Sequence, residues 1–204
     1  MNDTDTPISP DAQTLFSIAS AQAGYFTAAQ ARESGYSSQL LAHHARTGRF
    51  LRIARGLYRL RDYPSAPREE IVAAWLRAGT DAVVSHESAL DLFGLSDVIP
   101  NAIHLTVPRA RRKLARTAGV VVHTTTRPLP PRDTLWREGV RVTAPARTIV
   151  DAAETGIGPD QIGDAVRQAV DRGLTTPDRL RRAATGRGHR VERLINAAVA
   201  TVTT

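Results

Sequence analysis

The chain of 204 residues contains no cysteine, which excludes disulfide bonds and thiolate metal sites. Its formal net charge of +7 comes from 26 arginines and the single lysine Lys113, and it favours a polyanionic partner, although a GC-rich genome would also raise the arginine content. The apolar runs are too short to cross a bilayer and the first residues lack the apolar segment of a signal peptide, so we expect a protein of the bacterial cytoplasm.

The N-terminal elements are predicted to be three short helices. Residues 1–10 are polar and acidic, which is typical of a disordered leader. Apolar residues at helical spacing predict a helix within 11–23. Thr27 is expected to cap a second short helix and Ser37 a third one, which ends near Gly48.

A β-hairpin is predicted next, with strands over about 50–54 and 57–60. The order helix, helix, turn, helix, hairpin predicts a winged helix-turn-helix domain over 11–63. The hairpin segment RFLRIARGLYRLR (49–61) contains five arginines and no acid. Genome bias would scatter arginines along the chain, whereas a binding site gathers them, so this hairpin indicates a DNA-binding wing.

The third helix is the expected recognition helix. Leu40 and Leu41 would pack on the first two helices, which leaves a polar stripe on the opposite face. Glutamine can bond adenine in a bidentate manner and arginine can bond guanine, so this stripe suits the major groove. Strand alternation would place Arg59 and Arg61 on the outward face of the hairpin if Tyr58 and Leu60 pack inward. The predicted DNA-binding residues are Ser38, Gln39, His43, Arg46, Arg49, Arg52, Arg55 and Arg59.

A proline-containing linker at 62–67 precedes a predicted mixed α+β domain over 68–204, so the fold class expected for the whole chain is α+β. We expect this domain to contain a small sheet followed by C-terminal helices, of which the last, over 189–202, is weakly helical and expected to fray. The expected helices are 68–79, 86–93, 144–155, 159–173 and 176–184, and the expected strands are AVVS (82–85), IHLTV (103–107), GVVVHT (119–124) and VRVT (140–143).

No catalytic, metal or cofactor site is expected in the second domain. Ser85 and His86 are adjacent, and neighbours on a helix point apart, so they are not expected to form a nucleophile–base pair; Ser85 is instead expected to cap a helix. His104 and His123 would lie on neighbouring strands without carboxylate or thiolate company, which argues against a metal site. The sequence also has no glycine-rich phosphate loop.

Two further charged features are expected to be structural or to contact a partner. Arg147 and Asp151 are spaced i, i+4 on a predicted helix, and we favour a buried structural pair over a partner contact. The segment 108–116 is a basic loop between two predicted strands, which could contact phosphate or an acidic protein surface, or simply remain in solvent. Its candidate contact residues are Arg109, Arg111, Arg112 and Lys113.

The motifs of the chain, taken in order, resemble those of the AbiEi antitoxins, which belong to bacterial abortive-infection toxin–antitoxin pairs. These motifs are GRFLRIARGLYRL (48–60), DAVVSHESALDLFGL (81–95), IHLTVPR (103–109), GVVVHT (119–124) and VRVTAPARTIVDAAETG (140–156). The resemblance implies an N-terminal winged helix that binds inverted repeats in the pair's own promoter as separate monomers. It also implies a C-terminal domain that counteracts a cognate nucleotidyltransferase-like toxin.

Two alternative functions remain open at this point. The first is a stand-alone transcription factor whose second domain senses a ligand. The second is an enzyme that acts on nucleic acid, because similar modules precede Vsr-like nuclease domains. The segment after Asp151 is too short for such a nuclease domain and lacks its acidic cluster, so we expect a non-enzymatic protein.

Overall fold

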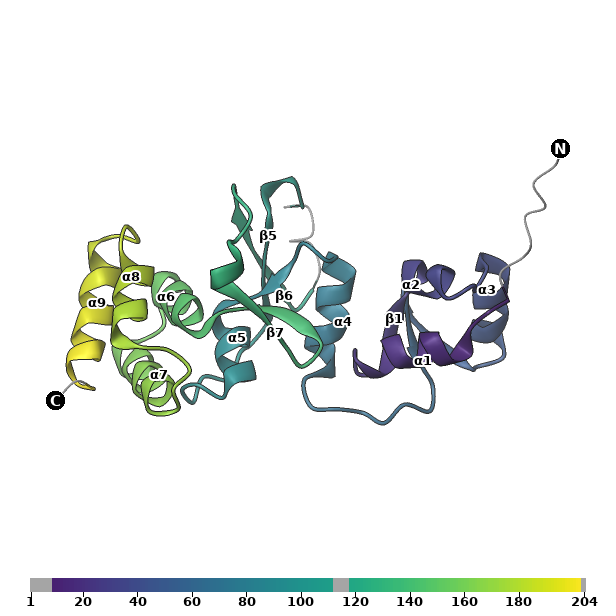
Figure 1. Ribbon diagram of the computed structural model, residues 1–204, viewed down its shortest axis with the longest axis horizontal. Helices are drawn as coiled ribbons and strands as arrows, with labels where there is room; N and C mark the ends of the chain where they lie inside the picture. The colour runs from purple at the N-terminus through teal and green to yellow at the C-terminus, as the bar shows by residue number, and fades with distance from the viewer. Residues whose placement is uncertain (1–8, 112–117, 203–204) are drawn as a thin grey trace. The chain divides into compact units, whose positions relative to one another are not determined.

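The computed structural model describes residues 9–111 and 118–202, and it divides into two compact units, Met1–Gly79 and Thr80–Thr204 (Figure 1). Most of the predicted leader, residues 1–8, lies outside the described residues. Both units combine helices with a small sheet, so the predicted α+β class is confirmed.

The described part of the first unit contains four helices, and polar side chains define where three of them begin. The Asp11 carboxylate accepts from the backbone of α1, and Thr27 and Gln30 form a reciprocal capping box at α2. The Ser37 hydroxyl accepts from the Leu40 N–H at the start of α3, so the predicted caps at Thr27 and Ser37 are confirmed. The helices are α1 (Ala12–Ser20), α2 (Ala28–Glu33), α3 (Ser38–Arg46) and α4 (Glu69–Ala78).

A three-stranded antiparallel sheet completes the first unit. The hairpin strands β2 (Phe50–Ala54) and β3 (Leu57–Leu60) have the predicted bounds, and the order is β1-β3-β2. The strand β1 (Tyr25–Thr27) was not predicted, because its three residues are too few to show a period of two. Phe26 and Phe50 meet edge to face at 5.0 Å in a core that α1, α2 and α3 share.

The second unit is built on a five-stranded mixed sheet of order β6-β5-β4-β8-β7. The pairs β5–β6 and β4–β8 are parallel, whereas β4–β5 and β7–β8 are antiparallel. Strand β7 was not predicted, because its consecutive residues Leu135 and Trp136 are both apolar and the segment shows no alternation; at this edge of the sheet both side chains are exposed. The strands are β4 (Val83–Val84), β5 (Ile103–Pro108), β6 (Val120–Thr125), β7 (Thr134–Arg137) and β8 (Val140–Thr143).

Among residues 80–111 and 118–202, five α-helices complete the second unit, and the last four form a bundle beside the sheet (Figure 1). The prediction that the last helix frays is wrong, because α9 buries Val191, Ile195 and Val199 against its neighbours in this bundle. Tertiary packing, not local propensity, orders this segment. The helices are α5 (His86–Phe93), α6 (Pro145–Thr155), α7 (Pro159–Asp171), α8 (Pro177–Ala184) and α9 (His189–Ala200), and the 3-10 turn η2 (Pro131–Asp133) precedes β7.

Candidate nucleic-acid interface and buried polar clusters

The α3 helix has the two faces that its sequence predicts. Leu41 is buried in the core, and His44 packs on Phe50 with ring centroids 5.0 Å apart. Burial lowers the pKa of His44, and the nearby cation Arg49 acts in the same direction. The opposite face of the helix is exposed, and it presents Ser38, Gln39, His43 and Arg46.

The hairpin places further cations beside this face. Strand register pairs Arg52 with Tyr58 and therefore puts Arg52 on the same face of the sheet as Phe50, which contacts α3. Arg49, Arg52 and Arg55 are all exposed. The hairpin turn is fixed in place, because the Gly56 carbonyl accepts from the Ala28 N–H at the start of α2. The exposed cations of the hairpin are therefore held on a rigid frame.

Arg59 departs from the predicted wing, because it is only 7% exposed. Its guanidinium lies 3.0 Å from Glu69 of α4 and 5.5 Å from the ring centre of Tyr25. Tyr58 and Leu60 pack toward the core as predicted, but α4 covers the other face of the sheet. The expectation that Arg59 lies on an outward face is therefore wrong.

Arg61 is exposed, but a contact within the protein accounts for its position. Its Nε donates to the Gly48 carbonyl at the end of α3. Gly48 has a φ of +80°, and a Cβ at this position would meet the Arg61 guanidinium. Arg61 therefore supports the junction between α3 and the hairpin.

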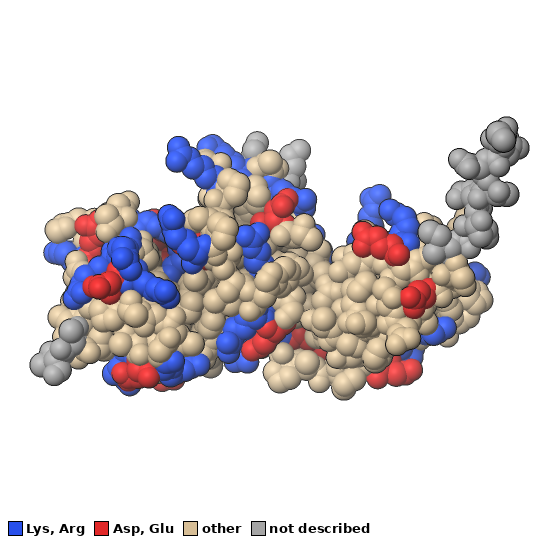
Figure 2. Space-filling view, viewed as in Figure 1, with Lys and Arg blue, Asp and Glu red and all other residues tan. Residues whose placement is uncertain are grey.

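The basic loop of the second unit is described only in part. Arg109 and Arg111 are exposed, and Arg111 lies 3.5 Å from Asp81. Arg112 and Lys113 lie outside the described residues. Figure 2 shows a separate gathering of Lys and Arg side chains over the C-terminal helices.

The predicted Arg147–Asp151 pair is part of a buried ion network. The Asp151 carboxylate is 2% exposed and lies 2.7 Å from both Arg147 and Arg187. Arg187 also pairs with Glu154 at 2.6 Å, and Arg147 with Asp133 at 3.4 Å. Burial raises the pKa of Asp151, and the two guanidiniums oppose this shift. The network ties α6 to the loop before α9 and to the turn before β7, which fits the structural interpretation.

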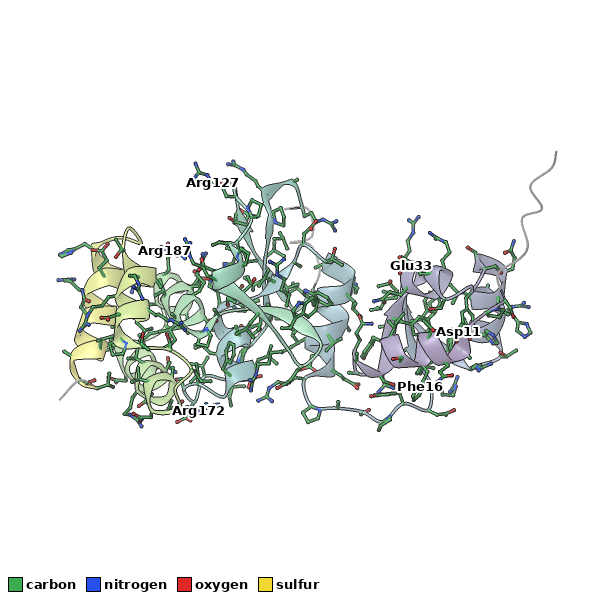
Figure 3. All side chains as sticks on the ribbon, viewed as in Figure 1. Asp11, Phe16, Glu33, Arg127, Arg172 and Arg187 are labelled. Carbon is green, nitrogen blue, oxygen red and sulfur yellow. The ribbon has the colours of Figure 1, made fainter. Side chains whose placement is uncertain are left out.

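An arginine-rich cavity of about 770 Å³ lies next to this network. Arg187, which belongs to both, is labelled in Figure 3. Several of the lining guanidiniums come from α8 and the turn before β7, so the cavity is suited to an anion. Its lining residues are Arg132, Asp133, Ala144, Pro145, Ala146, Arg147, Leu174, Thr175, Arg179, Arg182, Ala183 and Arg187.

Ser85 and His86 contact each other, contrary to the sequence prediction. His86 has a φ of +53°, and this left-handed conformation brings its Nδ1 to 2.8 Å from the Ser85 hydroxyl. Ser85 stands at the N-cap position of α5, but its side chain accepts from the Thr106 hydroxyl and does not cap the helix. Ser85 is fully buried, so its hydroxyl is not accessible to a substrate. The pair is therefore structural.

Three histidines meet at the junction of α5, β5 and β6. The ring centroids of His86 and His123 lie 3.5 Å apart, and His104 Nδ1 lies 3.1 Å from His123 Nε2. The expectation that His104 and His123 lack carboxylate company is wrong, because Glu87 Oε2 lies 3.9 Å from His104 Nε2. The sequence predicted that His104 and His123 lie on neighbouring strands, and β5 and β6 do pair. It did not predict that His86 joins them, because the contact of His86 with these two rings depends on its left-handed backbone conformation.

Burial keeps these three imidazoles neutral. It lowers the pKa of His86 to about 2 and that of His123 to about 4, and it lowers the pKa of His104 as well. Neighbouring positive charges lower the pKa of His86 further, while Glu87 opposes the shift at His104. Each ring therefore carries one unprotonated nitrogen at neutral pH.

Comparison with known proteins identifies both units of the chain. Residues 13–61 match a family described as "Transcriptional regulator, AbiEi antitoxin", and residues 82–196 match the "AbiEi antitoxin C-terminal domain". No curated protein matches the sequence. The fold is similar to a solved structure titled "Crystal structure of RV2827C protein from Mycobacterium tuberculosis", with a TM-score of 0.51 and 16% sequence identity over 97% of this chain and 83% of the other. No helix in the described part of the chain has the length and apolar character needed to span a membrane.

Proposed function

Because the chain belongs to the AbiEi antitoxin family, we propose that this DNA-binding antitoxin represses the promoter of its own toxin–antitoxin pair and counteracts a cognate nucleotidyltransferase-like toxin. The two activities divide between the two units. The first unit binds inverted repeats in the promoter, one monomer to each repeat, and the second unit acts on the toxin. Both activities belong in the bacterial cytoplasm, and neither requires a catalytic residue or a cofactor.

One observation supports the DNA-binding part of the proposal most strongly. The exposed face of α3 and the exposed cations of the hairpin occur together in the unit that matches the regulator family. Gln39 and Arg46 read bases in the major groove, while Ser38 and His43 contact either bases or phosphates. Arg49, Arg52 and Arg55 contact the phosphate backbone or the minor groove, which positions the helix on the duplex. Arg109, Arg111, Arg112 and Lys113 are candidates for additional contacts with DNA or with the toxin.

A reporter assay tests autoregulation directly. The upstream region of the gene drives a reporter in a heterologous host, with and without the full-length chain. We expect expression of the chain to lower reporter output, and mutation of either inverted repeat to restore it. An unchanged output, together with no binding of the purified protein to this region, would contradict autoregulation.

Toxin neutralisation is tested separately, because it concerns the second unit. The test requires a nucleotidyltransferase-like protein that is encoded next to this gene, and this protein serves as the candidate toxin. Its expression should arrest growth, and co-expression of residues 80–204 should restore growth without any repression of the promoter. Growth arrest that neither this fragment nor the full chain relieves would exclude this protein as the antitoxin.

The arginine-rich cavity favours a second candidate function, which is regulation by an anionic ligand. Its five arginines outnumber the single lining acid, Asp133. Arginine is suited to bidentate recognition of phosphate or carboxylate. Thermal-shift measurements with inorganic phosphate and pyrophosphate test this function. We expect stabilisation that is lost in Arg179→Ala, whereas identical melting with and without both anions excludes the ligand.

A further inference from the structure

We propose that His86, His104 and His123 form a binding site for a divalent transition-metal cation of the Zn²⁺ type. The observation that carries this proposal is the convergence of three imidazoles from three different elements. One nitrogen of each ring lies within 4.8 Å of the ligand nitrogens of the other two. His86 comes from the start of α5, His104 from β5 and His123 from β6. All three histidines belong to the second unit, and the site does not depend on the proposed function.

The geometry selects which nitrogens would bind the metal. His104 Nδ1 and His123 Nε2 lie 3.1 Å apart. Two nitrogens bound to one tetrahedral Zn²⁺ at about 2.0–2.1 Å are about 3.3 Å apart, so this pair needs almost no rearrangement. His86 Nδ1 is held at 2.8 Å from the Ser85 hydroxyl, which leaves its Nε2 as the third ligand. The His86 ring stacks on the His123 ring with an interplanar angle of 15°, so metal binding requires the His86 ring to turn out of this stack.

Two of the three rings lie near side chains of the kind that hold metal-binding histidines in place. Such a histidine commonly donates its second ring nitrogen to a carboxylate, a hydroxyl or a carbonyl group. Glu87 Oε2 lies 3.9 Å from His104 Nε2, and Ser85 holds His86. Ser85 is itself fixed by the Thr106 hydroxyl at 2.8 Å. The His104 backbone N–H donates to Ser88 Oγ at 2.9 Å, so the start of α5 fixes this part of β5.

The burial of the cluster also favours binding of a metal ion by the imidazole nitrogens over their protonation. The residues His86 and His104 are each 6% exposed, and a protonated imidazole is poorly solvated there. Without a metal, the three neutral rings can share only one hydrogen bond among themselves, between His104 and His123. The nearest cations, Arg147 and Arg187, are paired with Asp151 and therefore repel a bound metal only weakly.

The protein ligands of this site are all imidazole nitrogens, and this donor set indicates the class of metal. Imidazole suits Zn²⁺, Co²⁺, Ni²⁺ and Cu²⁺, whereas Mg²⁺ and Ca²⁺ require oxygen ligands. The three histidines leave the fourth tetrahedral position to water, which can enter beside the half-buried His123. A bound metal would join α5 to the strands β5 and β6 and so stabilise the second unit.

The test uses the full-length protein after removal of metals with a chelator. Titration with Zn²⁺ should show one ion per chain and a higher melting temperature, and Mg²⁺ should have neither effect. Titration with Co²⁺ should produce the intense visible absorption of a tetrahedral ion. His104→Gln and His123→Gln should each weaken Zn²⁺ binding by at least tenfold.

His189→Gln is the matched control, because it removes an exposed histidine from the same unit and should leave binding unchanged. Zn²⁺ binding that survives both cluster variants, or that is lost in the control, would overturn the proposal. Absence of any stoichiometric Zn²⁺ binding by the parent protein would also overturn it. If a cluster variant fails to fold, NMR of the parent protein provides the test. Zn²⁺ is then expected to shift the ring signals of three of the six histidines, and a different number would contradict the proposal.

Discussion

At the scale of single residues, the hairpin arginines divide into two functional groups. Arg52 and Arg55 are exposed, whereas Arg59 is buried against Glu69. Charge on an exposed hairpin can be used for phosphate contacts, but a buried and paired guanidinium has no free capacity for DNA. The two groups therefore predict opposite phenotypes in binding and stability measurements.

The exposed group should affect affinity without affecting specificity. Arg52→Ala and Arg55→Ala should each weaken binding to operator and unrelated DNA alike, because phosphates carry no sequence information. Each substitution should also reduce the slope of log affinity against log salt by about 1. Titrations at several salt concentrations measure both quantities. A variant that discriminates sequences less well, with an unchanged salt slope, would contradict the phosphate assignment.

The buried arginine should affect folding instead. Arg59→Ala removes a mostly buried partner of Glu69, so we expect a loss of roughly 1–3 kcal/mol in the free energy of unfolding, below the full cost of breaking a buried pair because Glu69 remains partly exposed. Thermal or urea unfolding measures this loss. Below the unfolding transition, the salt slope of DNA binding should equal that of the parent protein. A changed salt slope in this variant would show that Arg59 contacts DNA.

The polar residues of α3 should determine specificity. Gln39→Ala and Arg46→Ala should each reduce discrimination between operator and altered base pairs by about 1–3 kcal/mol, because a bidentate base contact is lost. Competition experiments with single base-pair variants of the operator measure this change. Ala42 lies on the same exposed face, and Ala42→Ser provides a control that keeps the helix intact. If both variants lose the same affinity for every DNA sequence, Gln39 and Arg46 contact phosphates and not bases.

At the scale of secondary structure elements, the Asp151 network holds α6 in position. Asp151→Ala leaves two mostly buried guanidiniums without their shared carboxylate, so we expect a loss of about 2–4 kcal/mol in the free energy of unfolding. Arg167→Ala breaks a solvent-exposed pair with Asp164 and should cause no measurable loss. Denaturant titration of the two variants distinguishes them. Equal stability of both would mean that the network does not anchor α6.

At the scale of the whole molecule, the position of α4 defines the smallest DNA-binding fragment. A fragment that ends at residue 66 lacks Glu69 and exposes the sheet face that α4 covers. We therefore expect residues 1–79 to melt cooperatively and to bind the operator, and residues 1–66 to be less stable. Circular dichroism melting followed by DNA titration compares the two fragments. A cooperative transition of equal stability in the shorter fragment would show that α4 is dispensable.

The sequence by itself determined most of the local elements of the first unit, with the exception of the short strand β1. The capping residues Thr27 and Ser37 and the alternation of the hairpin are short-range signals, and the structure has them where they were predicted. The polar face of α3 was also predictable, since a helical period fixes which side chains share a face. The family resemblance followed from the order of the motifs along the chain, and both family matches confirm it.

Only the tertiary structure decided which of these side chains are available for function. Arg59 follows the predicted strand alternation, but its exposure depended on α4, a helix that starts ten residues later in the chain. The histidine cluster depended on the pairing of β5 with β6 and on the left-handed backbone of His86. The frayed helix expected at the C-terminus is ordered by packing against its neighbours in the bundle. Periodicity and capping act within a few residues, whereas burial and side-chain convergence arise from contacts between distant segments, which no local pattern encodes.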